Sequence, residues 1–172
     1  GPNGAGKPST IRMILGLVAP TSGRIDVLGA PDARSVRERI GFLPEERGLY
    51  RRMTPLDAIV FLGGLKGVPR AECRKRAMAL LEEQGLGYAA KRQIRNLSKG
   101  MAQKVQLISA IVHEPELVIL DEPFSGLDPV NQQALEGVIR GLAARGATVI
   151  FSTHVMQHAE RLCDHVVLLA KG

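Results

Sequence analysis

The chain has few aromatic residues and no tryptophan, with four Phe and two Tyr among its 172 residues. Stacking on exposed nucleic-acid bases therefore has few candidate side chains. Cysteine is also scarce, because only Cys73 and Cys163 occur and their separation matches no metal-ligand spacing. These absences exclude a disulfide framework and a zinc module, and they favour a reducing compartment.

Long apolar runs are also missing. The longest ones, such as residues 166–170, are much shorter than the ~20 residues that a membrane-spanning helix requires. The composition, 45% hydrophobic and 23% charged, is that of a globular protein. The net charge of +6 is concentrated between Arg34 and Lys104. Two interpretations of this basic segment stay open: attraction of nucleic acid, anionic lipid or phosphate ligands, or an Arg-rich solvated surface.

Apolar segments without polar alternation, separated by helical patterns, predict a parallel sheet covered by helices on both faces, which is an α/β fold. The expected strands are residues 23–28, 40–43, 117–120, 147–151 and 166–169. The expected helices are residues 9–17, 55–66, 70–84, 99–112, 131–144 and 155–162. The segment 53–100 has no convincing strand and is interpreted as a helical insertion.

A glycine-rich loop opens the chain and reads GPNGAGK at residues 1–7. The spacing G-x-x-x-x-G-K is typical of a phosphate-binding loop, in which backbone amides surround the phosphates and Lys7 adds a positive charge. Such a loop normally follows a buried strand. The chain also stops directly after an apolar segment, so we expect a fragment that is incomplete at both ends.

Pro8 departs from the phosphate-loop motif, which has Ser or Thr after the lysine because that hydroxyl ligates Mg²⁺. Proline is tolerated in the first turn of a helix, but it disfavours helical geometry at the preceding residue, Lys7. Ser9 and Thr10 supply a replacement hydroxyl only if the loop shifts by one residue, and the apolar spacing of the following helix shows no such shift. We therefore expect weakened binding of Mg·ATP.

The apolar strand at residues 117–120 is followed by two acids, Asp121 and Glu122. Ligands of parallel sheets gather at the carboxyl ends of the strands. One carboxylate there is suited to Mg²⁺, and its neighbour is suited to accept a proton from an attacking water. Together with the phosphate loop, this pair indicates a nucleotide-hydrolysing site.

The phosphate loop and the acidic strand end, in this order along the chain, resemble the motifs of the ATP-binding subunit of an ABC transporter. Such a subunit is a P-loop NTPase with an α-helical subdomain. The resemblance covers essentially the whole chain. Residues 97–101, LSKGM, stand where the family has its LSGGQ signature. Residues 125–128, SGLD, match the D-loop, and His154 matches the switch histidine. Glu45 occupies the position of the Q-loop glutamine.

The resemblance implies ATP and Mg²⁺ as cofactors and assigns roles to these side chains. Implied catalytic residues are Glu122 as general base, His154 at the γ-phosphate, and Glu45. Implied cofactor-binding residues are Asn3, Gly4, Ala5, Gly6, Lys7, Ser9, Thr10, Ser98, Gly100 and Asp128. Implied metal ligands are Asp121, Glu45 and Ser9.

The resemblance also implies an organisation and partners. Residues 1–52 and 105–172 correspond to the α/β core of a partial ABC ATPase domain, and residues 53–104 to its helical subdomain. The implied partners are a polytopic membrane permease and a second ATP-binding subunit arranged head to tail, without nucleic acid. The implied location is cytoplasmic, peripheral on the inner face of the cell membrane. The strings PEERGLY and SKGM are similar to the sodium and drug exporter branch typified by NatA.

The implied function is ATP hydrolysis that powers export of a small solute or ion. Two alternatives remain: a regulatory subunit that binds nucleotide but is catalytically impaired by Pro8, and a soluble ABC ATPase that takes no part in transport. His113, His158 and His165 match no motif and are expected to be surface or capping residues, and the two cysteines are expected to be packing residues.

Overall fold

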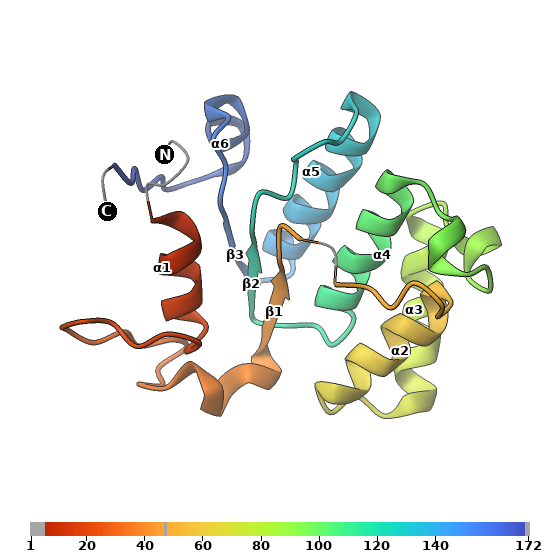
Figure 1. The fold of residues 1–172 in the computed structure, drawn as a ribbon, viewed down its shortest axis with the longest axis horizontal. Helices are drawn as coiled ribbons and strands as arrows, with labels where there is room; N and C mark the ends of the chain where they lie inside the picture. The colour runs from red at the N-terminus through yellow and green to blue at the C-terminus, as the bar shows by residue number, and fades with distance from the viewer. Residues whose placement is uncertain (1–5, 47, 171–172) are drawn as a thin grey trace.

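The computed structural model describes residues 6–46 and 48–170, and its centre is a parallel sheet of three strands (Figure 1). The strands, in spatial order, are β1 (Ile40–Leu43), β2 (Leu117–Leu120) and β3 (Thr148–Phe151). Leu43, Leu120 and Phe151 are aligned in register, so the carboxyl ends of all three strands lie at one edge of the sheet. The sheet and its covering helices confirm the predicted α/β fold.

The described part of the chain contains six α-helices. They are α1 (Lys7–Ile14), α2 (Pro55–Leu65), α3 (Arg70–Glu83), α4 (Lys99–Ile111), α5 (Pro129–Ala144) and α6 (Met156–Leu162). Short 3₁₀ helices span Ala33–Arg39, Gly87–Ala89 and Ile94–Asn96.

The strand β2 explains how the sheet is covered, because all of its side chains are buried. Leu117 and Ile119 pack in one cluster with Ile11 of α1. Val118 and Leu120 pack in another cluster with residues of α4 and α5. Alternate strand residues point to opposite faces, so α1 covers one face and α4 and α5 cover the other (Figure 1).

A third hydrophobic cluster joins α2, α3 and α4, and α4 contributes to both this cluster and the one on the sheet. The helix α4 lies very close to β1, because a Cβ added at Gly41 would lie 2.2 Å from the carbonyl oxygen of Ala110. Only glycine fits at that approach. The division into a core and a helical subdomain at residues 53–104 stays a prediction, and α4 continues through its boundary.

Two predicted strands are wrong. Residues 23–28 form only an isolated bridge between Val27 and Ala30, and residues 166–169 lie in no strand. The side chains of Val166, Val167 and Leu168 are 51%, 82% and 70% exposed. An apolar or alternating pattern predicts a strand only where another strand supplies hydrogen-bond partners, and no described strand lies beside either segment.

Two histidines also differ from expectation. His158 on α6 is buried and stacks on Phe124, with ring centroids 4.0 Å apart. His113 is half-buried, and its Nε2 donates a hydrogen bond to the carbonyl oxygen of Ile40 at 3.2 Å. Among residues 6–46 and 48–170, every helix is too short or too polar to span a bilayer.

Candidate active site

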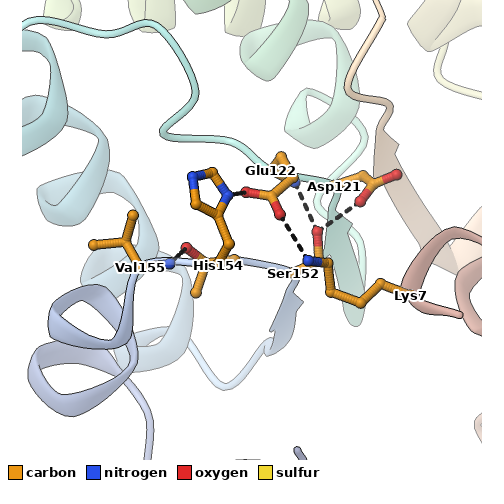
Figure 2. A network of polar contacts seen from close by, with 7 residues as sticks. Lys7, Asp121, Glu122, Ser152, His154 and Val155 are labelled. Carbon is orange, nitrogen blue, oxygen red and sulfur yellow. Dashed lines mark hydrogen bonds and ion pairs between the residues drawn. The ribbon is translucent and has the colours of Figure 1, made fainter. Parts of the chain in front are cut away.

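The candidate site lies at the carboxyl ends of β2 and β3. Asp121 and Glu122 directly follow β2, and the segment from Ser152 to His154 directly follows β3. Because the two strands are parallel neighbours, both segments leave the sheet at the same edge. Figure 2 shows that Lys7, at the start of α1, points into the same place.

Glu122 is the centre of this group. One oxygen of its carboxylate, Oε1, lies 3.2 Å from the ammonium nitrogen of Lys7, and the other, Oε2, lies 3.0 Å from Nδ1 of His154. A carboxylate only accepts hydrogen bonds, so Nδ1 is the donor. The side chains of Lys7 and Glu122 are each 11% exposed. Three residues predicted from separate motifs are thus brought together (Figure 2).

The backbone of Glu122 is in the left-handed region, with φ 44°. For a residue with a side chain this costs about 1–3 kcal/mol, and such conformations gather at functional sites. The amide of Glu122 donates to the hydroxyl oxygen of Ser152 at 2.8 Å, and its carbonyl accepts from the amide of Ser125 at 3.0 Å. The surrounding bonds therefore stabilise the strained geometry.

Ser152 is the residue that the sequence reasoning missed. Its hydroxyl donates to Oδ1 of Asp121 at 2.6 Å while accepting from the amide of Glu122. The available signal was a polar residue directly after an apolar strand, two positions before His154.

The phosphate loop is described only from Gly6 onward, so the predicted positions Asn3, Gly4 and Ala5 lie outside the described residues. Gly6 precedes α1 with φ 93°, a left-handed conformation that favours glycine. The amide and the hydroxyl of Thr10 both donate to the carbonyl oxygen of Gly6, at 2.9 and 3.0 Å. The positive end of α1 and the cation of Lys7 together fit an anionic ligand.

The expectation that Pro8 moves Lys7 out of helical geometry is wrong, because α1 begins at Lys7. Pro8 occupies the first turn, where backbone amides need no partner within the helix, so its missing N–H disrupts no helical hydrogen bond. Ser9 is exposed on the next position of α1.

Glu45 follows β1 and is exposed at the rim of a cavity of about 390 Å³ that Asp121 and Glu122 also line. The other lining residues are Leu43, Pro44, Glu46, Lys99, Gln103, Gln106, Pro123 and Ser125. Carboxylate oxygens are the ligands that Mg²⁺ prefers, so Asp121 and Glu45 fit this metal by their chemistry. No cluster of three or more metal-ligating side chains is already assembled in the described ranges.

The residues of the signature and the D-loop have local roles. The hydroxyl of Ser98 caps α4 by accepting from the amide of Met101 at 3.2 Å. Gly100 packs against the side chain of Asn131. Asp128 caps α5 by accepting from the amide of Asn131 at 3.0 Å, and this hydrogen bond is the main cause that holds the pKa of Asp128 below its usual value.

Ser98 begins α4, whereas Lys7 begins α1, and these two helices cover opposite faces of the sheet (Figure 1). In the described chain Lys99, the middle residue of the signature segment, lines the cavity beside Asp121 and Glu122, whereas Ser98 and Gly100 do not.

Residues 1–125 match the family model described as ABC transporter. The ABC transporter ATP-binding protein YhaQ of Bacillus subtilis is 46% identical over 172 residues, which cover 100% of this chain and 58% of YhaQ. The linearmycin resistance ATP-binding protein LnrL of the same organism is 38% identical over 175 residues, covering 100% of this chain and 56% of LnrL. The chain thus spans somewhat more than half the length of these curated relatives.

A solved structure titled as an ATP-binding subunit of an ABC transporter superposes with a TM-score of 0.90 at 37% identity. It covers 99% of this chain, and the chain covers 72% of that structure.

Proposed function

The chain belongs to the ABC transporter family, and we propose that the whole protein binds and hydrolyses ATP with Mg²⁺ to power export of a small solute or ion through a partner membrane subunit. The observation that carries this proposal is the group formed by Lys7, Glu122 and His154 beside Asp121. The name of LnrL, a resistance protein, favours export over import.

In the proposed reaction each side chain has a separate task. The amides at the start of α1 and the cation of Lys7 bind the phosphates. Asp121 holds Mg²⁺, with Glu45 at the rim of the same cavity. The metal, when bound, neutralises charge on the phosphates. Glu122 accepts the proton of the attacking water, and His154 donates a hydrogen bond to the terminal phosphate.

The ion pair between Lys7 and Glu122 implies that the nucleotide binds before Glu122 acts as the base. A phosphate has to compete with the Glu122 carboxylate for the Lys7 ammonium group. Once Lys7 turns to the phosphate, the carboxylate is left with His154 and is available to a water molecule. Binding of the nucleotide would thus release the base that the chemistry requires.

We further propose that the protein works with a second ATP-binding subunit and a polytopic permease, on the inner face of the membrane. Ser98 and Gly100 start α4 on the far face of the sheet from α1, so a head-to-tail neighbour would offer its own α4 start to the nucleotide at Lys7. Asp128 lies in the segment that would face this neighbour. The strings PEERGLY and SKGM favour the sodium and drug exporter branch.

The test uses the full-length protein with its permease in proteoliposomes, with phosphate release from Mg·ATP as the measurement. Glu122→Gln keeps the size of the side chain and removes the base, so we expect at least a hundredfold loss of rate (about 10²–10⁴-fold for such groups). Glu116→Gln is the matched control, because Glu116 also pairs with a cation, Arg39, but at the amino end of β2.

Equal loss in both variants would overturn the assignment of Glu122. A wild-type protein that binds Mg·ATP without hydrolysing it would favour the regulatory alternative, which rests on Pro8. Phosphate release that does not change with the permease would favour a soluble ABC ATPase.

A further inference from the structure

Ser152 lies at the end of the neighbouring strand, next to the two acids of the site. It directly follows β3, is 9% exposed, and its amide donates to the carbonyl oxygen of Leu120 at 2.9 Å. This backbone bond continues the ladder between β2 and β3 by one residue. The position of the Ser152 side chain is therefore set by the sheet and not by a loose loop.

The hydroxyl of Ser152 makes two hydrogen bonds, one as acceptor and one as donor. The amide of Glu122 has only a proton to give, so the hydroxyl oxygen accepts there, at 2.8 Å. The single hydroxyl proton then goes to Oδ1 of Asp121, at 2.6 Å, a short bond to a charged acceptor. Figure 2 shows the hydroxyl between the two acids.

Each of these bonds constrains a different feature of the site. The bond to Asp121 fixes the rotation of its carboxylate, and Oδ2 has no hydrogen-bond partner in the described part of the chain. The bond from Glu122 holds the backbone at φ 44°, the conformation in which the side chain reaches both Lys7 and His154.

We propose that Ser152 is a positioning residue, which orients Asp121 for the metal and holds Glu122 in the strained backbone conformation that aims its carboxylate into the site. The inference rests on the proposed function, because it assigns no chemistry to Ser152 itself. Outer partners of metal-ligating carboxylates typically change metal affinity or activity by about 10–100-fold when removed.

The experiment uses the full-length protein with its permease and three variants. Ser152→Ala removes the hydroxyl, Ser152→Thr keeps it, and Ser109→Ala is the matched control. Ser109 is equally buried, at 7% exposed, but its hydroxyl donates to the carbonyl of Val105 within α4. The measurements are the Mg²⁺ concentration for half-maximal phosphate release, the melting temperature, and ATP affinity by calorimetry with Mg²⁺ and with EDTA.

We expect Ser152→Ala to raise the half-saturating Mg²⁺ concentration about tenfold or more. Its ATP affinity should fall in Mg²⁺ and should not fall in EDTA, because only the metal-dependent part of binding involves Asp121 and a displaced Glu122 leaves Lys7 to the phosphates. Ser152→Thr should restore both values. Ser109→Ala should leave both values at the wild-type level, even if its melting temperature falls as far as that of Ser152→Ala.

A metal requirement of Ser152→Ala equal to that of the wild type would overturn the inference and leave the proposed function intact. Loss of affinity that is equal with and without Mg²⁺, or that follows the melting temperature in both alanine variants, would overturn it as well, since both outcomes indicate a merely structural serine. A wild-type protein whose ATP binding and hydrolysis need no Mg²⁺ would overturn the inference and the proposed function together.

Discussion

The two ends of the same sheet carry similar side chains and put them to different uses. At the carboxyl end, Glu122 pairs with Lys7, and both side chains are 11% exposed. At the amino end, Glu116 pairs with Arg39 at 2.6 Å, and these side chains are 57% and 43% exposed. An ion pair by itself therefore does not identify a functional site.

The two ends of the sheet differ in the hydrogen-bond partners of their polar side chains. At the amino end, Lys66 donates to the carbonyl oxygens of Arg37 and Ile40 at 2.7 and 2.9 Å, and His113 donates to the same Ile40 oxygen. These two side chains therefore donate their hydrogen bonds to backbone carbonyl oxygens. At the carboxyl end, Glu122 accepts from two side chains of other segments, an arrangement that a ligand can rearrange without opening the fold.

The strongest test of this comparison replaces each of two lysines, Lys7 and Lys66, with alanine in a separate variant. Lys7→Ala should weaken ATP binding at least a hundredfold, on the scale of about two charge-assisted hydrogen bonds, whereas Lys66→Ala should lower stability and leave ATP affinity unchanged. Calorimetric titration of the full-length protein with ATP measures the first effect, and thermal unfolding measures the second. Comparable losses of ATP affinity in both variants would show that the two ends do not differ as described.

The amino end should also respond to pH through His113. Burial is the main cause that lowers the pKa of His113 from 6.5 to about 4. Below pH 6.5 the unfolded chain takes up a proton that the folded chain refuses, so the free energy of unfolding should fall as the pH drops from about 6.5 to 4 and then level off. The loss should be on the order of 2 kcal/mol, allowing for the partial exposure of the ring.

Denaturant unfolding between pH 4 and 7 measures this loss. His113→Gln, which keeps a hydrogen-bond donor but does not titrate, should have a smaller slope in the same window. If the slopes are identical, another group is responsible for the pH dependence.

A smaller effect is expected at Pro8. Pro8→Ser supplies the hydroxyl and the backbone donor that the phosphate-loop motif contains, and it should raise Mg·ATP affinity about tenfold, the equivalent of one charge-assisted hydrogen bond. Ser9→Ala is the control, because Ser9 is exposed on α1. An unchanged affinity in Pro8→Ser, combined with a loss in Ser9→Ala, would assign the metal hydroxyl to Ser9 instead.

The smallest effect is expected for the pair of Arg39 and Glu116. Glu116→Gln removes one charge of an exposed pair, and such pairs contribute little to folding. The melting temperature should stay within about 2 °C of the wild type. A larger decrease would mean that this exposed pair contributes more to folding than exposed pairs usually do.

Much of the site followed from local patterns. The apolar strand before Asp121 and Glu122, the glycine-rich loop at Lys7 and the strand before His154 each indicated a place at the carboxyl edge of a parallel sheet, and the structure brings the four residues together there. The pattern worked because burial on both faces leaves parallel strands few alternatives to an unbroken apolar run.

Other features did not follow from local patterns. The strand predicted at 166–169 depends on a partner for its backbone groups, and the short apolar run carries no information about that partner. The role of Ser152 depends on the register between β2 and β3, which puts its hydroxyl beside Asp121. The helical start at Lys7 was not expected, because the bias that Pro8 places on the preceding residue was given more weight than the tolerance of proline in the first turn.

The amino-acid sequence alone was enough to establish which chemical groups the protein has and that Asp121, Glu122 and His154 follow apolar strands, because hydrophobic periodicity and turn residues act over short distances. The contact of Lys7 with a carboxylate more than a hundred positions later, the left-handed Glu122 and the bridging hydroxyl of Ser152 arise only once the strands are aligned. Hydrogen bonds demand a fit within tenths of an ångström between distant segments, and that fit belongs to the folded sheet.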